Sequence, residues 1–256
     1  MEDLSQDFDL LKKAAREAAE LVLTYRGRPV ASERKADGSA VTEADKAADS
    51  LLAARLKGAR PEYGWLSEES PEHENRLRAR RVWIVDPIDG TREFLRGGSD
   101  WTVALALVQD SIPVLAAVIN PVRGEVFEAR AGKGAFLNGR PCVISSRNEL
   151  GGARIAASLP AKRPWRAPWP GAVPVSASST IYRLALVASG RADASFALNP
   201  KWEWDIAAGA LLITEAGGMV TGLSGAPLAF NSAEAKVEGF VAAAPQLHQS
   251  LIERLR

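Results

Sequence analysis

An apolar run that ends in two closely spaced carboxylates constrains this chain more than any other stretch. Residues Val82 to Val85 are all hydrophobic and are typical of a buried β-strand. Asp86 and Asp89 follow, separated by Pro87, whose ring restricts the backbone. Two oxygen ligands at a strand end, next to the turn that begins at Gly90, are typical of a site for a divalent cation and a phosphate. The alternative is that Asp-Pro and Asp-Gly only mark turns, which is their commonest use.

Composition and charge exclude several broad classes of protein. The chain has 256 residues, 46% hydrophobic and 25% charged, as expected for one large globular domain or two compact halves. The formal net charge is only +1, so no affinity for nucleic acid is expected. We expect no membrane insertion, because no apolar run is long enough to span a bilayer and the acidic N-terminus does not look like a signal peptide. A single cysteine, Cys142, cannot form an internal disulfide, which favours a cytoplasmic location.

Helical patterns dominate the beginning of the chain. Apolar residues between Leu10 and Tyr25 repeat at helical spacing with charged residues opposite, and Gly27 ends the pattern. A second helix is predicted to begin after Thr42, which has the spacing of a capping box with Asp45. An acid in a first turn is favoured by the helix dipole, so Asp45 has a structural explanation that needs no catalysis.

Strands are predicted next, and more acids accompany them. A short strand at residues 64–66 leads into Glu68 and Glu69, either of which can converge on the two aspartates that end the following strand. The charged segment that contains His73 is expected to be exposed. From residue 102 to 140, apolar runs separated by turn residues predict a meandering antiparallel sheet.

A change in composition at residues 145–152 predicts a domain boundary. We expect an α+β domain over residues 1–144 and a smaller α/β domain over residues 145–256. The second half is predicted to contain two short strands, an irregular loop and an amphipathic helix capped by Ser178 or Ser179: strands at 154–158 and 192–198, the loop at 160–174 and the helix at 179–190. Asp205 is expected at the N-cap or in the first turn of a further apolar helix, a position that needs no metal.

Four pieces of sequence occur in a specific order. They are Asp45, Glu68-Glu69, Asp86-Pro-Ile-Asp89-Gly-Thr91 and Trp204-Asp205-x-Ala-Ala. Together they resemble the magnesium-dependent, lithium-sensitive phosphomonoesterase family of inositol monophosphatases and bisphosphate nucleotidases, over nearly the whole chain. The resemblance implies a layered α-β-α-β-α sandwich of the α/β class.

The resemblance also implies a metal site. Two or three Mg²⁺ ions would be the cofactor, with Li⁺ as an inhibitor. Glu68, Asp86 and the backbone carbonyl of Ile88 would hold one ion, and Asp86 would bridge to a second ion completed by Asp89 and Asp205. Because Asp205 belongs to the second half, the site would lie between the two halves.

Catalytic roles follow from the same likeness. Asp45, Thr91 and Glu68 would be catalytic: the Thr91 hydroxyl would donate to Asp45 and accept from the attacking water, which Mg²⁺ activates. The phosphate would be bound, partly through the amides of the Gly-Thr turn, by Asp89, Gly90, Thr91 and Asp205. The role of Glu69 stays open.

The substrate is harder to predict. The segment Asp89-Gly-Thr-Arg-Glu-Phe94 looks most like the bacterial 3′(2′),5′-bisphosphate nucleotidases, which implies hydrolysis of the 3′-phosphate of 3′-phosphoadenosine 5′-phosphate. Inositol phosphatases carry a glutamate seven positions before the Trp-Asp aspartate, where it binds ring hydroxyls. This chain has Leu198 there, and an apolar side chain cannot accept those hydrogen bonds. Alternatively, Leu198 is a core strand residue in a shifted alignment.

Other readings stay open. Trp165, Trp169 and Trp202 could stack on an adenine, although packing or surface positions explain them equally well. Inositol 1-phosphate, histidinol phosphate or another sugar phosphate could be the substrate in place of the nucleotide. A phosphate-binding regulatory protein that acts through partners is the alternative without turnover. The expected partner is a small phosphomonoester, and a homodimer is compatible with a family whose members differ in oligomeric state.

Overall fold

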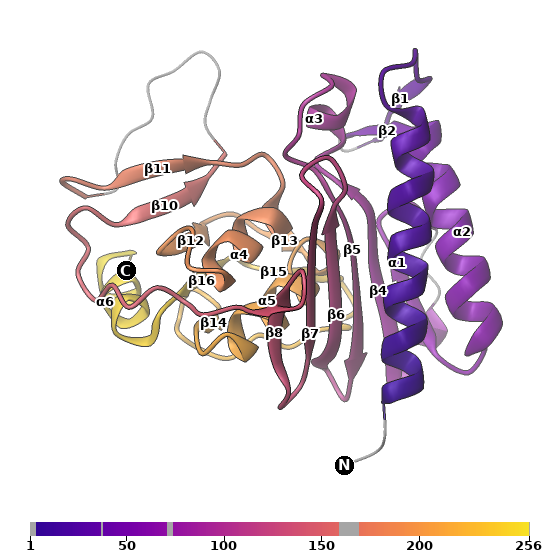
Figure 1. Ribbon diagram of the computed structural model, residues 1–256. Coiled ribbons are helices and arrows are strands. Elements are labelled where there is room, and N and C mark those ends of the chain that lie inside the picture. Colours follow the sequence, from indigo (N-terminus) through magenta and orange to yellow (C-terminus); the bar gives the residue numbers. More distant parts are fainter. Residues whose placement is uncertain (1–3, 37, 71–73, 159–168, 256) are drawn as a thin grey trace.

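Helices and sheets alternate in five layers. The computed structural model describes residues 4–36, 38–70, 74–158 and 169–255, so His73 and Trp165 lie outside the described residues. Two helices, a sheet, two helices, a second sheet and one helix follow one another across the molecule (Figure 1). This order confirms the predicted α-β-α-β-α sandwich. In the part of the chain that the structure describes, no helix is long and apolar enough to cross a membrane.

A seven-stranded sheet forms the centre of the first half. Its strands, in spatial order, are β3 (Gly64–Ser67), β4 (Arg81–Asp89), β5 (Thr102–Gln109), β6 (Ile112–Asn120), β7 (Glu125–Arg130), β8 (Gly134–Leu137) and β9 (Arg140–Pro141). Strand β3 is parallel to β4 and all other neighbours are antiparallel, which confirms the predicted meander. Smaller elements of this half are the β1–β2 hairpin (Ser32–Arg34, Ala40–Thr42), the 3-10 turn η1 (Glu74–Arg78) and α3 (Thr91–Leu95).

Successive side chains of β4 point to opposite faces of this sheet, and both faces are covered by helices. Trp83 and Val85 pack into the core formed with α1 (Ser5–Tyr25) and α2 (Glu43–Ala59). Val82 and Ile84 point to the opposite face and join the core that contains the helices of the second half. A strand buried on both sides needs a continuous apolar run, which is what the sequence provides.

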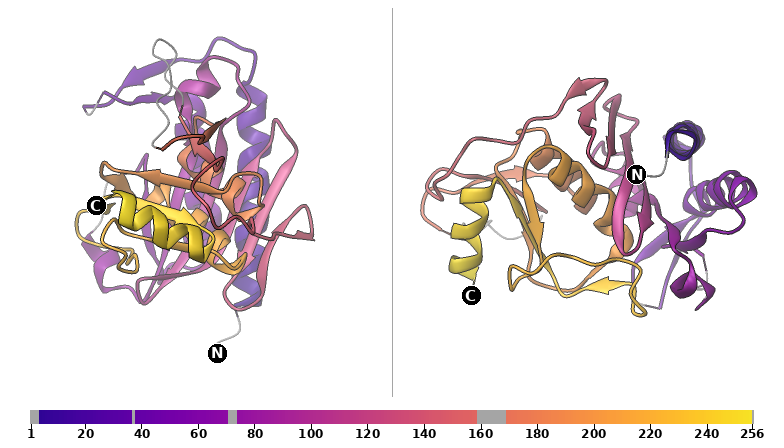
Figure 2. Two further views of the ribbon diagram at one scale, coloured as in Figure 1. Left: turned by 90° about the vertical axis from the view of Figure 1, so that its left-hand side faces the viewer. Right: turned by 90° about the horizontal axis from the view of Figure 1, so that it is seen from below.

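The second half supplies the remaining three layers. A five-stranded sheet contains, in spatial order, β11 (Val173–Ser176), β10 (Arg154–Ala157), β12 (Ala194–Ala197), β16 (Phe240–Ala243) and β14 (Met219–Thr221). Helices α4 (Thr180–Ala188) and α5 (Ala207–Glu215) lie between the two sheets, and α6 (Pro245–Leu255) covers the outer face (Figure 2). A short pair, β13 (Lys201–Trp202) and β15 (Lys236–Val237), and the 3-10 turn η2 (Glu203–Asp205) complete it.

Three predictions about the second half were wrong in detail. The helix expected to be amphipathic is buried at every position of α4, because a sheet lies on either side of it. Asp205 is not an N-cap: it ends η2, and Ile206 precedes α5. The loop expected over residues 160–174 overlaps β11, which begins at Val173, and its residues 160–168 lie outside the described residues.

The two halves share one core. The largest buried cluster takes residues from both, among them Ile84, Phe127, Leu184 and Phe240. Each sheet is built from one side of the predicted boundary, since the first ends at Pro141 and the second begins at Arg154. The division into domains at residues 144 and 145 stays a prediction.

Candidate active site

A β-bulge brings Asp86 and Asp89 to the same side of their strand. Asp86 pairs with Ala104 and Asp89 with Thr102, so β4 contributes one more residue than β5 between these two pairs. Side chains three positions apart on a regular strand point to opposite faces, and one extra residue returns them to the same face. The alternation of the sequence therefore does not reveal this juxtaposition.

A third carboxylate arrives from the second half of the chain. Asp86, Asp89 and Asp205 each offer an oxygen, and these three atoms lie within 4.8 Å of one another. Asp86 is 1% exposed, and neither of its oxygens has a hydrogen-bond partner among the described residues. A buried carboxylate without a partner is costly unless a cation neutralises it. Because all the donors are hard oxygens, the cluster fits Mg²⁺.

The crowding of these acids raises their pKa values. Burial raises the pKa of Asp86 well above its usual value, and the negative charge of Glu68 raises it further. Burial, and then the charge of Asp89, raise the pKa of Asp205 to about 8. A cation bound among these groups would favour their ionised forms, so cation binding and proton release are coupled here.

The first turn of α4 holds Asp89 in place. The Ser179 hydroxyl and the Ile181 amide both donate to Asp89 Oδ2, each at 2.6 Å. Ser179 is also the N-cap of α4 and accepts from the Tyr182 amide at 2.9 Å. The cap was predicted, but the contact with Asp89 was missed because it joins residues 90 positions apart. Burial raises the pKa of Asp89, and these two hydrogen bonds oppose that shift.

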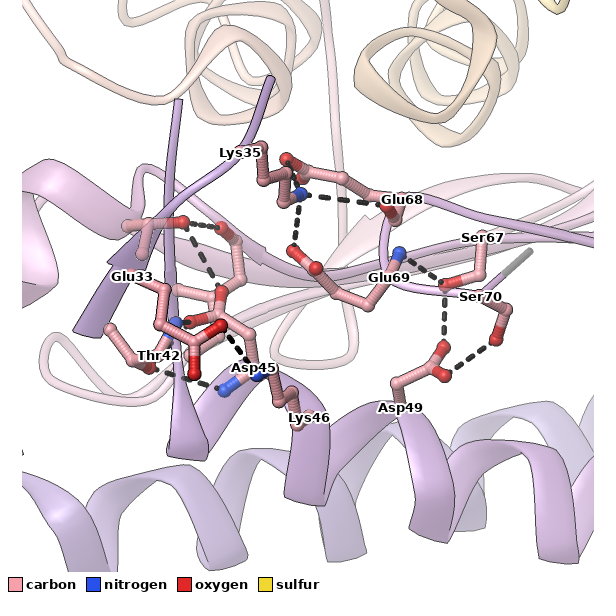
Figure 3. A network of polar contacts seen from close by, with 12 residues as sticks. Glu33, Lys35, Thr42, Asp45, Lys46, Asp49, Ser67, Glu68, Glu69 and Ser70 are labelled. Carbon is pink, nitrogen blue, oxygen red and sulfur yellow. Dashed lines mark hydrogen bonds and ion pairs between the residues drawn. The ribbon is translucent and has the colours of Figure 1, made fainter. Parts of the chain in front are cut away.

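Glu68 and Glu69 share a lysine that the sequence did not single out. Lys35 Nζ donates to Glu68 Oε1 at 2.8 Å and to Glu69 Oε1 at 2.7 Å (Figure 3). Glu68 lines the same pocket as Asp89 and Asp205, but it is not part of the three-aspartate cluster. Lys35 thus forms ion pairs with two adjacent glutamates. Burial raises the pKa of Glu69 to about 7. The ligand role of Glu68 stays a prediction.

Buried hydrogen bonds fix the segment on which these two glutamates lie. Asp49, on α2, accepts from the hydroxyls of Ser67 and Ser70, each at 2.6 Å (Figure 3). The Ser67 hydroxyl in turn accepts from the Glu69 amide at 3.4 Å. Asp49 therefore anchors both ends of the short turn that carries Glu68.

Asp45 combines helix capping with a contact to Thr91. Asp45 Oδ2 accepts from the amide of Thr42 at 2.7 Å and from its hydroxyl at 2.5 Å, which confirms the predicted capping box (Figure 3). Thr91 Oγ1 lies 3.2 Å from Asp45 Oδ1 and 3.1 Å from the Ile88 carbonyl, so its one hydrogen has two acceptors. The expected hydrogen bond is therefore present, and its role in hydrolysis stays a prediction.

Gly90 is required by two features of the turn. Its φ of +101° is rare for residues with a side chain, and an added Cβ would lie 3.1 Å from the Asp100 carbonyl oxygen. Gly90 is the N-cap of α3, which begins at Thr91. The first amides of a helix have no partner within the helix, so they are oriented to meet an anion.

An open pocket of about 410 Å³ is lined by several of these groups. Its wall includes Glu68, Ile88, Asp89, Gly90, Thr91 and Asp205, together with three cationic residues, Arg92, Arg96 and Lys201. These three cations were not predicted as site residues, because isolated basic residues carry no recognisable pattern in the sequence. The lining of the pocket therefore combines acidic side chains, Glu93 among them, with these three cationic side chains.

Two of the tryptophans considered for stacking, Trp169 and Trp202, serve packing instead. Trp169 is buried against Phe196, and Trp202 stacks on Trp204 with ring centres 4.7 Å apart and has Lys236 Nζ 3.9 Å from its own ring centre. Neither ring lines the pocket. Leu198 is 53% exposed, so it is not a core strand residue.

Comparison with known proteins identifies the family. The model of the inositol monophosphatase family matches residues 3–256. The chain belongs to the inositol monophosphatase family. It is 36% identical over 227 residues to the putative Nus factor SuhB of Neisseria meningitidis, covering 83% of this chain and 85% of that protein. It is 32% identical over 239 residues to inositol monophosphatase 2 of Solanum lycopersicum, covering 85% and 87%. The structure of the extragenic suppressor protein suhB from Bartonella henselae superimposes with a TM-score of 0.85 at 29% identity, covering 98% and 99% of the two chains.

Membership confirms the predicted family and reaction class. The protein is a phosphoric monoester hydrolase of the inositol monophosphatase family, which depends on Mg²⁺ in general. The three-aspartate cluster is compatible with that requirement. The relatives compared carry the names of inositol monophosphatases and SuhB proteins rather than of bisphosphate nucleotidases.

Proposed function

We propose that this protein hydrolyses a small phosphomonoester in a pocket where Asp86, Asp89, Asp205, Glu68 and the carbonyl of Ile88 hold two or three Mg²⁺ ions. The observation that carries this proposal is the buried Asp86 carboxylate, which has no hydrogen-bond partner among the described residues and has oxygens of two other aspartates within 4.8 Å. Bound Mg²⁺ supplies neutralisation of the charge that develops on the phosphoryl group. Li⁺ is expected to inhibit.

Residues of the chain orient the nucleophile. Thr91 Oγ1 accepts a hydrogen bond from the attacking water while it donates its own hydrogen to Asp45 at 3.2 Å. Asp45 Oδ2 already accepts hydrogen bonds from two donors of Thr42, so only Oδ1 is left to accept the hydrogen bond from Thr91. The amides of Gly90 and Thr91 bind phosphate oxygens at the start of α3.

The substrate that we propose is 3′-phosphoadenosine 5′-phosphate, cleaved at its 3′-phosphate. Support comes from the wall of the pocket, where Arg92, Arg96 and Lys201 can bind a second phosphate of the substrate. Leu198 adds support, since it provides no carboxylate for ring hydroxyls. The adenine would not rely on Trp169 or Trp202, which are engaged in packing.

Inositol 1-phosphate is the second candidate. The name of the relative from Solanum lycopersicum, inositol monophosphatase 2, favours it. Histidinol phosphate and other sugar phosphates would use the same chemistry. A third role, binding of phosphate without turnover and action through protein partners, is favoured by relatives named Nus factor SuhB. A homodimer and a cytoplasmic location stay predictions.

Release of inorganic phosphate from 3′-phosphoadenosine 5′-phosphate, inositol 1-phosphate and histidinol phosphate tests these proposals. We expect the highest kcat/KM for the nucleotide, activity only with Mg²⁺, and inhibition by Li⁺. A higher kcat/KM for inositol 1-phosphate would overturn the choice of substrate and leave the mechanism in place. No hydrolysis of any of the three with Mg²⁺ would favour the role through partners. The Asp205→Asn variant is the control for contaminating phosphatases.

A further inference from the structure

A fully buried glutamate lies two residues before Asp205. Glu203 has no exposed surface, and its carboxylate receives three hydrogen bonds from one turn of the chain. The Asn231 amide donates to Oε2 at 2.5 Å, and the amide and hydroxyl of Ser232 donate to Oε1 at 2.8 and 2.7 Å. The Glu203 amide also donates to the Ala235 carbonyl at 2.8 Å. The η2 turn and residues 231–235 are therefore joined along both side chain and backbone.

The same turn is held from the opposite direction by a buried arginine. Arg76 is 2% exposed, and its Nη1 donates to Asn231 Oδ1 at 2.7 Å and to the Ser232 carbonyl at 2.9 Å. The side-chain amide of Asn231 returns a hydrogen bond to the Arg76 carbonyl at 3.0 Å. The Arg76 backbone packs against β3, where a Cβ on Gly64 would lie 3.1 Å from the Arg76 Cα. We call Glu203, Arg76 and the turn of Asn231 and Ser232 the clamp.

The clamp connects the two segments that bring acids to the pocket from different halves. Strand β3 leads directly to Glu68, and η2 ends at Asp205. Among the described residues the Asp205 carboxylate makes no hydrogen bond, in contrast to Asp89, which has two from α4. In the described part of the chain no hydrogen bond fixes the side chain of Asp205, so its position depends on the backbone of η2.

Repulsion makes such support necessary. Ionised carboxylates within 4.8 Å of each other repel strongly in a partly buried site, and Asp205 lies within this distance of both Asp86 and Asp89. We propose that Glu203, held through the turn to Arg76, is a positioning residue that keeps Asp205 within coordination distance of the other two aspartates. This inference rests on the proposed role of Asp205 as a metal ligand.

Mutation of the clamp should weaken metal binding and leave the rate of hydrolysis at saturating Mg²⁺ nearly unchanged. In Glu203→Gln one end of the side chain becomes an NH₂ group that faces an N–H donor of the turn. Residues that orient metal ligands typically change affinity by about 10–100-fold when they are replaced. We therefore expect the Kd for Mn²⁺, measured by electron paramagnetic resonance, to rise by about 10–100-fold. The Mg²⁺ concentration for half-maximal activity should rise with it, while kcat at saturating Mg²⁺ stays close to that of the wild type.

A second variant separates the clamp from the folding of η2. Asn231→Gly removes both side-chain hydrogen bonds to Arg76 and leaves Glu203 untouched, and glycine accepts the left-handed φ of +65° at this position. It should raise the Mn²⁺ Kd in the same direction by a smaller factor. If Glu203→Gln does not fold, the Mn²⁺ Kd of the Asn231→Gly variant alone tests the positioning role.

The chain offers a matched control at the far end of α5. Glu215 accepts from the amides of Gly132, Lys133 and Gly134 at 2.8, 3.1 and 2.7 Å, so it also joins the two halves through three hydrogen bonds. Glu215→Gln should lower the unfolding temperature and leave the Mn²⁺ Kd within twofold. A Glu203→Gln or Asn231→Gly protein that behaves like this control would overturn the positioning role. A wild-type protein that binds neither Mn²⁺ nor Mg²⁺ would instead refute the proposed metal site.

Discussion

Replacement of Asp86 by asparagine should make the metal-free protein more stable and inactive. Asp86 is buried, has no hydrogen-bond partner for either oxygen in the described part of the chain, and lies against Asp89 and Asp205. Asparagine has nearly the same shape and removes the charge. In the absence of metal this substitution removes mainly repulsion and desolvation, because the Asp86 carboxylate has no hydrogen bond to lose among the described residues.

The size of the effect follows from the upper limit on the separation of the oxygens. Two ionised carboxylates at this limit of 4.8 Å repel by about 3.5 kcal/mol at an effective dielectric constant of about 20, and closer ones repel more strongly. Protonation relieves part of this, because the pKa of Asp86 lies well above its usual value and that of Asp205 is about 8. We therefore expect a net gain of about 2 kcal/mol in the free energy of unfolding at pH 8. For a chain of this length that is roughly 5 °C in unfolding temperature.

The assay is thermal and urea unfolding at pH 8 in a chelator and again with Mg²⁺. Asp86→Asn should unfold at a higher temperature than the wild type in the chelator, gain little from Mg²⁺ and hydrolyse no substrate. Asp49→Asn is the control of opposite sign, since both Asp49 oxygens accept from serine hydroxyls and the change should cost about 1–3 kcal/mol. An Asp86→Asn protein that is destabilised in the chelator, or that keeps the full Mg²⁺-dependent shift, would refute this reasoning.

Three further predictions concern single groups that line the pocket or contact its lining residues. The pKa of Asp205 rises from 3.8 to about 8 on folding, so its contribution to metal-free stability is complete below about pH 4 and is lost as the pH rises through 8. Unfolding temperatures measured in a chelator should therefore fall between about pH 4 and about pH 8, while the Mg²⁺ affinity measured by calorimetry should rise. Thr91→Val should lower kcat by about 10²–10⁴-fold with an unchanged Mg²⁺ requirement, and Thr91→Ser should restore most of the rate; a rate close to that of the wild type in the valine variant would exclude the Thr91–Asp45 pair from catalysis. Ser179→Gly keeps an acceptable N-cap but removes the hydroxyl from Asp89, so the Mn²⁺ Kd should rise about 10-fold with little loss of stability, and an unchanged Kd would show that the Ile181 amide suffices.

The parts of the fold that depend on neighbouring residues could be predicted from the sequence. The apolar run before Asp86 predicted a buried strand, and Thr42 with Asp45 predicted a helix start, because both depend on neighbouring residues alone. The order of acidic motifs indicated the family and with it the layered fold. The first-turn acid expected at Asp205 was wrong in detail, since packing against β4 places that residue in a 3-10 turn before α5.

Contacts between distant residues could not be predicted in this way. The bulge that puts Asp86 and Asp89 on one face depends on pairing with β5, and the sequence of β4 by itself favours opposite faces. Lys35 lies more than thirty positions from the two glutamates it contacts, and it looks like any other surface lysine in the sequence. Trp202 could have been a platform for a base, and only the stacking with Trp204 shows that it is engaged elsewhere.

Hydrogen bonding distinguishes the acids of the candidate active site by the role that each can take. Asp45 accepts two donors on one oxygen and Thr91 on the other, so it has little capacity left for a cation and is suited to orienting water. Asp89 has one oxygen occupied by Ser179 and Ile181, which leaves the other for a single ion. Asp86 alone is buried with both oxygens unpartnered among the described residues, so it is the carboxylate best able to bridge two ions. If this reasoning holds, Asp86→Asn should abolish binding of both ions, whereas Asp89→Asn should reduce the number of bound Mn²⁺ ions by one.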